Sequence, residues 1–487
     1  MPRCNVTVVN SPGCDYCPKV IDSRNSYLTV GLGAEECLYG NYTRFSKQCV
    51  DYYFLDFCEL CYESLHSYRS RNVTFSQYAI ECRDSAFLYD CRNCSYCFGC
   101  VGLRNKQFYI FNRPYLAEEY KRTIETFNLG NFVQLQEFRE KFEEFKRRYP
   151  RRFARLEHCV DVTGNDVANG KHCHACFDID ASDGSIENCK YVFIGTSLKD
   201  GYDIFETGEN GEFCYEVALG FGYKILFSAF IPGGSHDIFY SDSCFDSFHL
   251  FGCVGLKKKS YCIFNKQYSK EDYFTLREKI IAHMNEMSYT DKQGRIYRYG
   301  EFFPPEFSPF AYNETIAQEY FPLTKEQALE QGYAWRDTEE RQYMITMTND
   351  RVPDHIKDVA DSILAEVISC AHASIYGGST SIECSEQCTT AFKIIPQELG
   401  FYRRMNLPLP RLCPNCRHYQ RLKQRNPLKL WHRKCTCGGK ISTNGVYINQ
   451  TTHFHGSNPC PNEFETSYAP DRKGIVYCEQ CYQSEVV

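Results

Sequence analysis

Short runs of aromatic, cysteine and β-branched residues alternate with polar turns between residues 31 and 112. Examples are residues 50–57, 73–80 and 86–89, which are separated by Asn, Asp, Ser, Arg and Gly. This pattern indicates short strands in either a β-sandwich or a β-solenoid. We favour a solenoid, because small, polarisable cysteine side chains fill the ladders of inward positions that stacked coils create.

The pattern occurs twice along the chain. Residues 98–120 read FGCVGLRNKQFYIFNRPYLAEEY and residues 251–273 read FGCVGLKKKSYCIFNKQYSKEDY, an offset of 153 residues. The same offset relates Cys91 to Cys244. The chain therefore contains a tandem duplication, and each unit ends in a Cys-rich segment that precedes a predicted helix.

Each predicted helix has the features of a cap on a solenoid end. Between residues 115 and 150, Leu135, Phe138, Phe142 and Phe145 form an apolar stripe at helical spacing, and Pro150 ends the helix. A second helix is expected at residues 268–287. Helices at these places would cover the open ends of the two solenoids.

The predicted fold is mainly β, with two tandem β-solenoid units, each capped by an α-helix, and a C-terminal zinc-ribbon module. The expected divisions are a first Cys-rich solenoid unit at 1–112, a capping helix region at 113–158, a second solenoid unit at 159–267, a capping helix at 268–287, a Pro/aromatic connector at 288–369 and a double zinc-ribbon module at 370–487.

Composition narrows the function classes. The 487 residues include 30 cysteines and carry a formal net charge of −6. No N-terminal apolar segment resembles a secretion signal, and no apolar run is long enough to span a membrane. We therefore expect a cytoplasmic protein whose thiols stay reduced, as buried residues or metal ligands. A secreted, disulfide-rich protein is the alternative. Any attraction to nucleic acid must come from a local basic surface.

The sharpest cysteine cluster of the first unit is the segment 91–100, CRNCSYCFGC. Taken alone, its two CxxC pairs suggest a zinc or iron–sulfur site. The second copy retains only Cys244 and Cys253 at the matching positions. We therefore interpret the cluster as an interior ladder, with metal binding as the alternative. Cys173 and Cys176 receive the same interpretation.

The C-terminal hundred residues carry the clearest metal signal. Two CxxC pairs and several further cysteines have the spacing of tetrahedral zinc sites, which usually take two ligands from each of two turns. One predicted site consists of Cys384, Cys388, Cys413 and Cys416. The other consists of Cys460, Cys478, Cys481 and one of Cys435 or Cys437. Residues 463–471 are expected to form a hairpin, His453 or His455 could replace a cysteine, and Cys370 could enter the first site.

Between these cysteines lies a segment, residues 401–434, that has ten Lys or Arg residues and no Asp or Glu. Interleaved aromatic residues make it a candidate for binding phosphates and exposed bases. The candidate nucleic-acid-binding residues are Arg403, Arg404, Arg417, Arg421, Lys423, Arg425, Lys429, Trp431 and Arg433. The alternatives are that these cations bind the acidic remainder of the protein or lie in solvent.

The strings FYRRMNLPLPRLCPNCR, RNPLKLWHRKC and CPNEFETSYAPDRKGIVYCEQCY, with FGCVGLKKKSYCIFNKQY, resemble a family from small-genome, candidate-phylum bacteria. Its members have duplicated Cys-rich repeats and zinc ribbons and no established activity. Some carry a CaiB/BaiF-like label, a CoA-transferase name, but this sequence has neither a nucleotide-binding loop nor a βαβ rhythm. The resemblance covers residues 20–487 and implies the fold and the zinc.

The expected function is a non-enzymatic zinc-binding scaffold, with two Zn²⁺ ions, that engages nucleic acid or a nucleic-acid-associated complex through its basic segment. A protein-interaction scaffold without nucleic acid is one alternative. An enzyme acting in a solenoid groove is another, but candidates such as Asp178/Asp180 or His236/Asp237 are isolated in the sequence.

Overall fold

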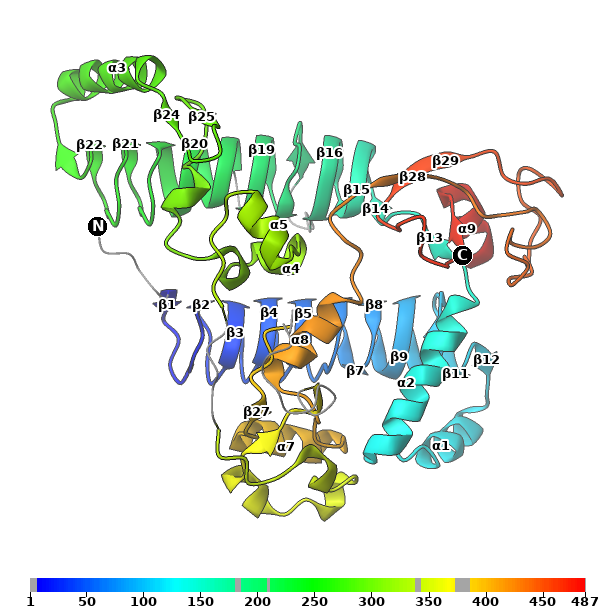
Figure 1. The fold of residues 1–487 in the computed structure, drawn as a ribbon. Coiled ribbons are helices and arrows are strands. Elements are labelled where there is room, and N and C mark those ends of the chain that lie inside the picture. Colours follow the sequence, from blue (N-terminus) through cyan, green and yellow to red (C-terminus); the bar gives the residue numbers. More distant parts are fainter. Residues whose placement is uncertain (1–6, 180–184, 208–210, 338–342, 373–385, 487) are drawn as a thin grey trace.

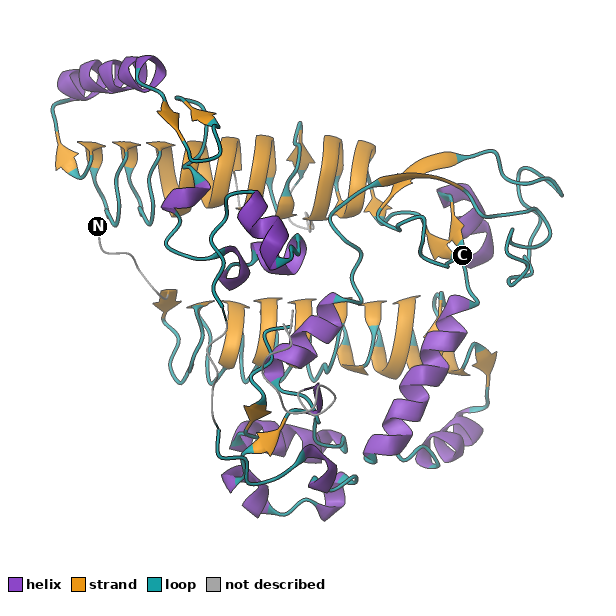
Figure 2. Ribbon diagram, viewed as in Figure 1, coloured by secondary structure: helices purple, strands orange, loops and turns teal. Residues whose placement is uncertain are grey.

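The computed structural model describes residues 7–179, 185–207, 211–337, 343–372 and 386–486. Two β-solenoids lie side by side along most of the molecule, and helices and loops lie around and between them (Figure 1). Figure 2 shows the two rows of stacked strands and the helices that flank them. The prediction of a mainly β fold with tandem solenoid units is confirmed.

The first solenoid is built from parallel strands one coil apart. Leu38 pairs with Val50, Leu65 with Gln77 and Ser95 with Gln107, so each coil uses about twelve residues. The strands are β1 Thr7–Val9, β2 Lys19–Ile21, β3 Tyr27–Leu32, β4 Leu38–Arg44, β5 Val50–Asp56, β6 Leu65–Tyr68, β7 Arg71–Thr74, β8 Gln77–Ile80, β9 Arg83–Arg92, β10 Ser95–Val101, β11 Gln107–Ile110 and the antiparallel β12 Arg113–Pro114.

Every third residue in this solenoid has left-handed backbone geometry. The φ angles of Glu36, Tyr39, Tyr42, Phe45 and Gln48 are 53°, 54°, 58°, 47° and 52°. Left-handed residues turn the chain sharply, and four of them occur in a twelve-residue coil. Each coil is therefore four-sided, with three residues to a side.

The residue after each left-handed corner points into the coil. Cys37, Cys49, Cys61 and Ser64 are completely buried in this way. Four sides of three residues enclose a narrow space, so small side chains are required. The inward groups also satisfy the backbone at the corners: the thiol of Cys82 contacts the carbonyl oxygens of Ile80 and Cys91, each at 3.4 Å. The cysteines at 91, 94, 97 and 100 belong to this buried interior.

The second solenoid follows the same plan. Ile186 pairs with Leu198 and Phe248 with Ser260, again about twelve residues apart. Cys173 and Cys176 lie in its buried interior. Its strands are β14 Leu156–Glu157, β15 Val160–Ala168, β16 Gly170–Ile179, β17 Ile186–Glu187, β18 Phe193–Gly195, β19 Leu198–Thr207, β20 Gly211–Phe239, β21 Phe248–Phe251, β22 Ser260–Ile263 and β23 Lys266–Gln267.

Helices follow each solenoid and pack on its last coils. After the first come α1 Ala117–Glu125 and α2 Phe132–Arg147. The apolar stripe of α2 meets the outer aromatic row of the coils, with Phe142 5.7 Å from Phe87 and Phe138 5.2 Å from Phe98 between ring centroids. After the second solenoid comes α3 Lys270–Glu286.

The remaining elements are short. They are β13 Arg151–Arg152, β24 Tyr289–Thr290, β25 Ile296–Tyr297, η1 Pro305–Phe307, η2 Tyr312–Glu314, α4 Ala317–Tyr320, α5 Lys325–Glu330, η3 Asn349–Arg351, η4 Ile356–Asp358, η5 Asp361–Ala365, β26 Ile368–Ser369, β27 Ala391–Phe392, α7 Pro396–Met405, α8 Pro414–Leu422, β28 Trp431–Lys434, β29 Glu463–Thr466, β30 Val476–Tyr477 and α9 Glu479–Val486.

Two parts of the C-terminal region belong to different hydrophobic cores. Residues around α7 and α8 share a hydrophobic core with the first solenoid, whereas those around β30 and α9 form a separate core. Strand β29 was expected to belong to a hairpin within residues 463–471, but its antiparallel partner is β28. Among the helices of the described residues, none has the length and hydropathy that crossing a lipid bilayer requires.

The narrow interior predicts a strong effect of adding one carbon atom. A Cβ at Gly40 would lie 2.0 Å from the ring of Tyr52, which is itself fully buried. We expect Gly40→Ala to lower the free energy of unfolding by about 1–3 kcal/mol through overpacking, measured by urea denaturation. The matched control is Gly234→Ala, where a Cβ meets nothing within 4 Å. An equal loss in both variants would contradict the packing argument.

Candidate metal centres

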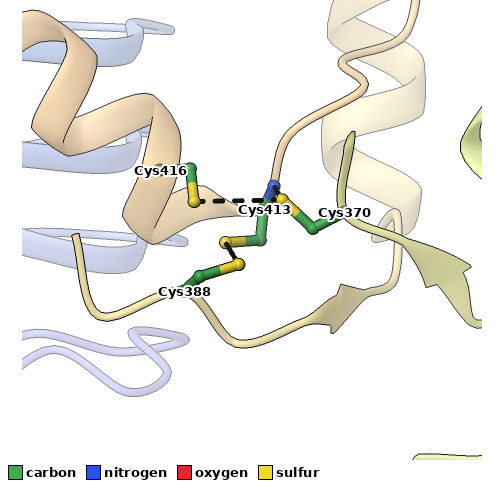
Figure 3. Close-up of side chains that lie close together, drawn as sticks. All are labelled: Cys370, Cys388, Cys413 and Cys416. Atoms are coloured by element: carbon green, nitrogen blue, oxygen red, sulfur yellow. Dashed lines mark hydrogen bonds between the residues drawn. The ribbon is translucent and has the colours of Figure 1, made fainter. Parts of the chain in front are cut away.

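The first cysteine cluster lies where α8 begins. Cys413 is the N-cap of α8, Cys416 is in its first turn, Cys370 follows β26 and Cys388 precedes β27 (Figure 3). The Sγ atoms are 3.8 Å apart for Cys370 and Cys416 and 4.0 Å apart for Cys388 and Cys413. Four sulfurs at 2.3 Å from one tetrahedral ion lie about 3.8 Å from one another, so this cluster fits a metal ion.

The surroundings of the first cluster suit thiolates. The backbone N–H of Cys413 donates to Cys370 Sγ at 3.2 Å, and that of Thr390 donates to Cys388 Sγ at 3.3 Å. A hydrogen bond from the Cys370 thiol lowers the pKa of Cys413. The sulfurs of Cys370 and Cys416, 3.8 Å apart, are not bonded to each other.

This cluster contains three of the predicted ligands of the first site together with Cys370, which the sequence analysis had left open as a member. Cys388, Cys413 and Cys416 lie together, and Cys370 takes the fourth place. Cys384, the predicted fourth ligand, lies outside the described residues. Cys370 is 43 residues before Cys413 and has no nearby cysteine partner in the sequence, which left its membership open until the fold was known.

The second cluster consists of Cys435, Cys460, Cys478 and Cys481, all buried. Their sulfurs lie within 4.8 Å of one another, and those of Cys460 and Cys478 are 3.8 Å apart. The N–H of Cys478 donates to Cys435 Sγ at 3.2 Å. Of the two cysteines left open by the sequence, the structure brings Cys435 into this cluster. The sulfur of Cys437 instead faces His453 Nδ1 at 3.1 Å.

The basic segment is mostly engaged within the protein. Arg417 and Arg421, on α8, each lie 3.0 Å from a carboxylate oxygen of Asp51, and Arg417 lies 2.9 Å from Glu398. All four side chains are buried, and burial raises the pKa of Glu398. Arg425 stacks over Tyr53 of the solenoid at 4.7 Å.

Arg417, Arg421 and Arg425 were predicted to contact nucleic acid, and all three are buried in this structure. Their charges face buried groups of the solenoid and of α7. The signal in the sequence was the helical spacing of Arg417 and Arg421, which places both on one face of α8. That face lies on an acidic corner of the coil.

The other predicted nucleic-acid residues are engaged by different parts of the chain. Arg403 pairs with Asp361 at 2.6 Å, and Lys423 pairs with Glu386. The remaining contacts are Arg404 over Phe401 at 5.9 Å, Lys429 over Trp431 at 5.3 Å, and Arg433 donating to the carbonyl oxygens of Tyr468 and Ala469 at 3.3 and 3.2 Å.

A basic cavity of about 570 Å³ lies beside the first solenoid. We call it the basic cavity. Seven of its lining residues are Lys or Arg and two are Glu. It is lined by Glu63, Phe75, Gln77, Tyr78, Phe87, Tyr89, Arg139, Phe142, Glu143, Lys146, Arg147, Arg151, Gln420, Lys423, Gln424, Asn426, Tyr468, Arg472 and Lys473.

Of the cations of the basic cavity, Arg139, Lys146 and Lys423 pair with carboxylates, whereas Arg151 lies beside aromatic rings. The guanidinium of Arg151 lies 5.6 Å from the Tyr89 ring and 5.8 Å from the Tyr468 ring. Within the described part of the chain, Arg147, Arg151, Arg472 and Lys473 form no ion pair with a carboxylate. Their charge is therefore available to an anionic ligand.

On the second solenoid, His236 and Asp237 are not isolated. His249, one coil later, joins them: its Nδ1 lies 3.8 Å from Asp237, and that of His236 lies 3.1 Å from Asp237. Asp178 is buried 3.7 Å from His66 of the first solenoid, and Asp180 lies outside the described residues. The coil period, which the sequence did not define, pairs His236 with Phe248 and so places His249 beside Asp237.

Comparison with known proteins leaves the function open. No protein-family model and no curated protein matches this chain. Among solved structures, a candidate acetyltransferase from Desulfovibrio desulfuricans G20 is similar at 10% identity over 51% of this chain and 69% of that chain, with a TM-score of 0.11. A likeness this low carries no argument about activity.

The first cluster makes a specific prediction about metal content. Because Cys370, Cys388, Cys413 and Cys416 form a complete set of four donors, Cys370→Ser should lose one metal ion per chain in elemental analysis of reducing-purified protein. Cys384→Ser is the matched control and should retain it. Loss of metal in Cys384→Ser with retention in Cys370→Ser would restore the sequence-based assignment.

The buried charges make a second prediction. Arg417→Ala removes one cation from between Asp51 and Glu398, both with no exposed side-chain area. Leaving a carboxylate buried without its partner should lower the free energy of unfolding by about 3–5 kcal/mol. The control is the exposed Arg404, whose replacement by Ala should cost about 0.5 kcal/mol or less. Equal losses in chemical denaturation would contradict this account.

Proposed function

We propose that this protein is a zinc-stabilised scaffold that binds the phosphates of a nucleic acid in its basic cavity. Zinc is the metal that we infer, because closed sets of four thiolates favour it over harder ions. With four cysteine ligands, a zinc ion has no open coordination position for a substrate, so we assign the cysteine clusters a structural role. The basic cavity is the observation that carries the ligand-binding part of the proposal.

The charge and shape of the basic cavity support this proposal. A chain with a net charge of −6 concentrates seven cations around one concavity. A volume of about 570 Å³ lies within the range of small-ligand sites and can admit a nucleotide unit. Lys146 is buried there between Tyr89 and Phe142, with Glu143 beside it, which holds its cationic head at the cavity wall.

A nucleic acid bound in the basic cavity would contact few of the residues 401–434. Lys423 is the predicted contact residue that lines the basic cavity. The other cations of the cavity come from α2, from β13 and from the loop between β29 and β30. Such a site would recognise backbone phosphate rather than base sequence, since its groups are cations and not paired donors and acceptors of base edges.

A second candidate is a protein-interaction scaffold, which exposed aromatic side chains on the second solenoid favour. Tyr191 and Tyr202 are 48% and 39% exposed, and their ring centroids lie 5.7 Å apart. Phe213 and Tyr223 repeat the arrangement at 5.6 Å. Binding through this row would be apolar and would depend little on salt, whereas binding in the basic cavity would weaken as salt rises.

Charge reversal in the basic cavity tests the proposal. Arg147→Glu with Lys473→Glu should weaken binding of a fluorescent single-stranded RNA by about tenfold or more at low salt. Each lost phosphate contact should also flatten the dependence of log K on log salt by about 0.7. Fluorescence anisotropy across a salt series measures both quantities.

The control is Arg403→Glu with Lys434→Glu, which makes the same change of net charge at exposed sites outside the cavity. Equal weakening in both double variants would show a non-specific charge effect. Unchanged binding in the cavity variant, or no RNA binding by the native protein, would overturn the nucleic-acid proposal and favour the protein scaffold.

A further inference from the structure

Beside the second cysteine cluster lies another group of four metal donors, one of which belongs to both. Cys437, His453, His455 and Cys481 place one donor atom each within 4.8 Å of the others. Cys437 Sγ is 3.1 Å from His453 Nδ1, and Cys481 Sγ is 3.2 Å from His455 Nε2. Nitrogen and sulfur donors on one zinc ion lie about 3.5 Å apart, close to these separations.

In both histidines, one ring nitrogen faces a sulfur and the other faces an oxygen acceptor. His453 Nε2 lies 2.8 Å from a carboxylate oxygen of Glu485, and neither side chain has exposed area. His455 Nδ1 lies 2.6 Å from the carbonyl oxygen of Asn458. A carbonyl oxygen only accepts, so His455 carries its proton on Nδ1 and presents a lone pair at Nε2.

The tautomer of His453 can be assigned in the same way, because several hydrogen-bond donors surround the Glu485 carboxylate. The hydroxyl of Tyr447 donates to this carboxylate at 2.8 Å, and the backbone N–H of Gln450 donates at 2.9 Å. Glu485 therefore acts as an ionised acceptor for the Nε2–H of His453, which turns the Nδ1 lone pair toward Cys437. A histidine whose far N–H is held by a carboxylate or carbonyl is the usual arrangement of a metal ligand.

The sulfur of Cys437 also accepts a hydrogen bond from a side chain whose orientation is fixed. The side-chain amide of Asn449 donates to it at 3.2 Å. The hydroxyl of Tyr477 donates to Asn449 Oδ1 at 2.7 Å, and this hydrogen bond fixes the orientation of the Asn449 amide. Asn462 plays the matching part for the neighbouring cluster, donating to Cys478 Sγ at 3.3 Å.

We propose that Cys481 bridges two metal ions, so that the C-terminal module holds a dinuclear centre. Cys435, Cys460 and Cys478 complete the first ion's tetrahedron, and Cys437, His453 and His455 complete the second. A thiolate has enough lone pairs to bind two ions at once. Five thiolates and two neutral imidazoles around two divalent ions leave a net charge of −1, whereas four thiolates around a single ion leave −2. Binding of the second ion thus reduces the net negative charge that is buried from −2 to −1.

Metal counting separates the two sites. In reducing-purified protein loaded with zinc, His453→Ala and His455→Ala should each lose one ion per chain relative to the native protein. The control is His432→Ala on β28, an exposed histidine paired with Glu463 and Glu465, which should lose none. Native metal content in both ligand variants would overturn the proposal.

Glu485→Gln tests the second ion without removing a ligand. A neutral amide should hold the His453 imidazole less firmly, so that a chelator extracts one ion about 10–100-fold more readily while the others are unaffected. Uniform release of all ions, or release as in the native protein, would contradict a site supported by this carboxylate.

The bridge can be tested in the native chain, with no risk that a variant fails to fold. Cobalt substituted for zinc should give sulfur-to-cobalt charge-transfer bands, and two cobalt ions that share Cys481 should couple magnetically. The coupled pair then contributes less to the electron paramagnetic resonance signal than separate ions would. A signal that grows in proportion to cobalt up to full loading would show separate ions and overturn the bridge.

Discussion

The width of a twelve-residue coil is the constraint on which the rest of the structure depends. Four left-handed corners close the backbone around a space that takes mainly a sulfur, a hydroxyl or a methyl group at each inward position. Cysteine and serine meet that limit and also hydrogen-bond to corner carbonyls, as Cys82 does. Large side chains are mostly turned outward, although Tyr52 stays inside opposite Gly40. The aromatic residues that would fill an ordinary core therefore line the outside, where the rest of the chain packs on them.

The outer rows explain how helices find their places. Helix α2 fits its apolar stripe onto stacked phenylalanines, a contact with little directional preference beyond shape. Helix α8 instead meets Asp51, an acidic corner that its two arginines match. Buried ion pairs add little net stability, because desolvation offsets their attraction, but a mismatched charge is costly. Asp51 thus fixes which coil α8 lies on, and with it the position of Cys413 and Cys416.

The fold class and most of the candidate metal ligands could be predicted from the sequence, but the coil geometry and the grouping of the ligands could not. Duplication and short strands indicated solenoids, and the CxxC pairs indicated metal. The three-residue period was visible at residues 91–100, yet other inward positions hold Ser, Thr, Val or Leu, which hides it elsewhere. Cys370 has no local partner, and the pairing of His453 with Glu485 joins residues 32 apart. For the basic segment, composition does not say whether an arginine faces solvent or a buried carboxylate, as Arg417 does.

The cysteine clusters and the basic cavity are connected, because the same segments of the chain contribute to both. One wall of the cavity is the end of α8, whose N-cap is Cys413 and whose first turn contains Cys416. Another wall is the loop that contains Arg472 and Lys473, which leads through β30 to Cys478. Between Cys437 and Cys460, Ile441, Val446, Ile448 and Phe454 are exposed, so hydrophobic burial does little to order that stretch. Under the proposed metal binding, the bound ions supply the missing free energy. Any ligand that needs both walls would then bind more tightly to the metal-loaded protein, and would in turn favour metal retention by the same factor.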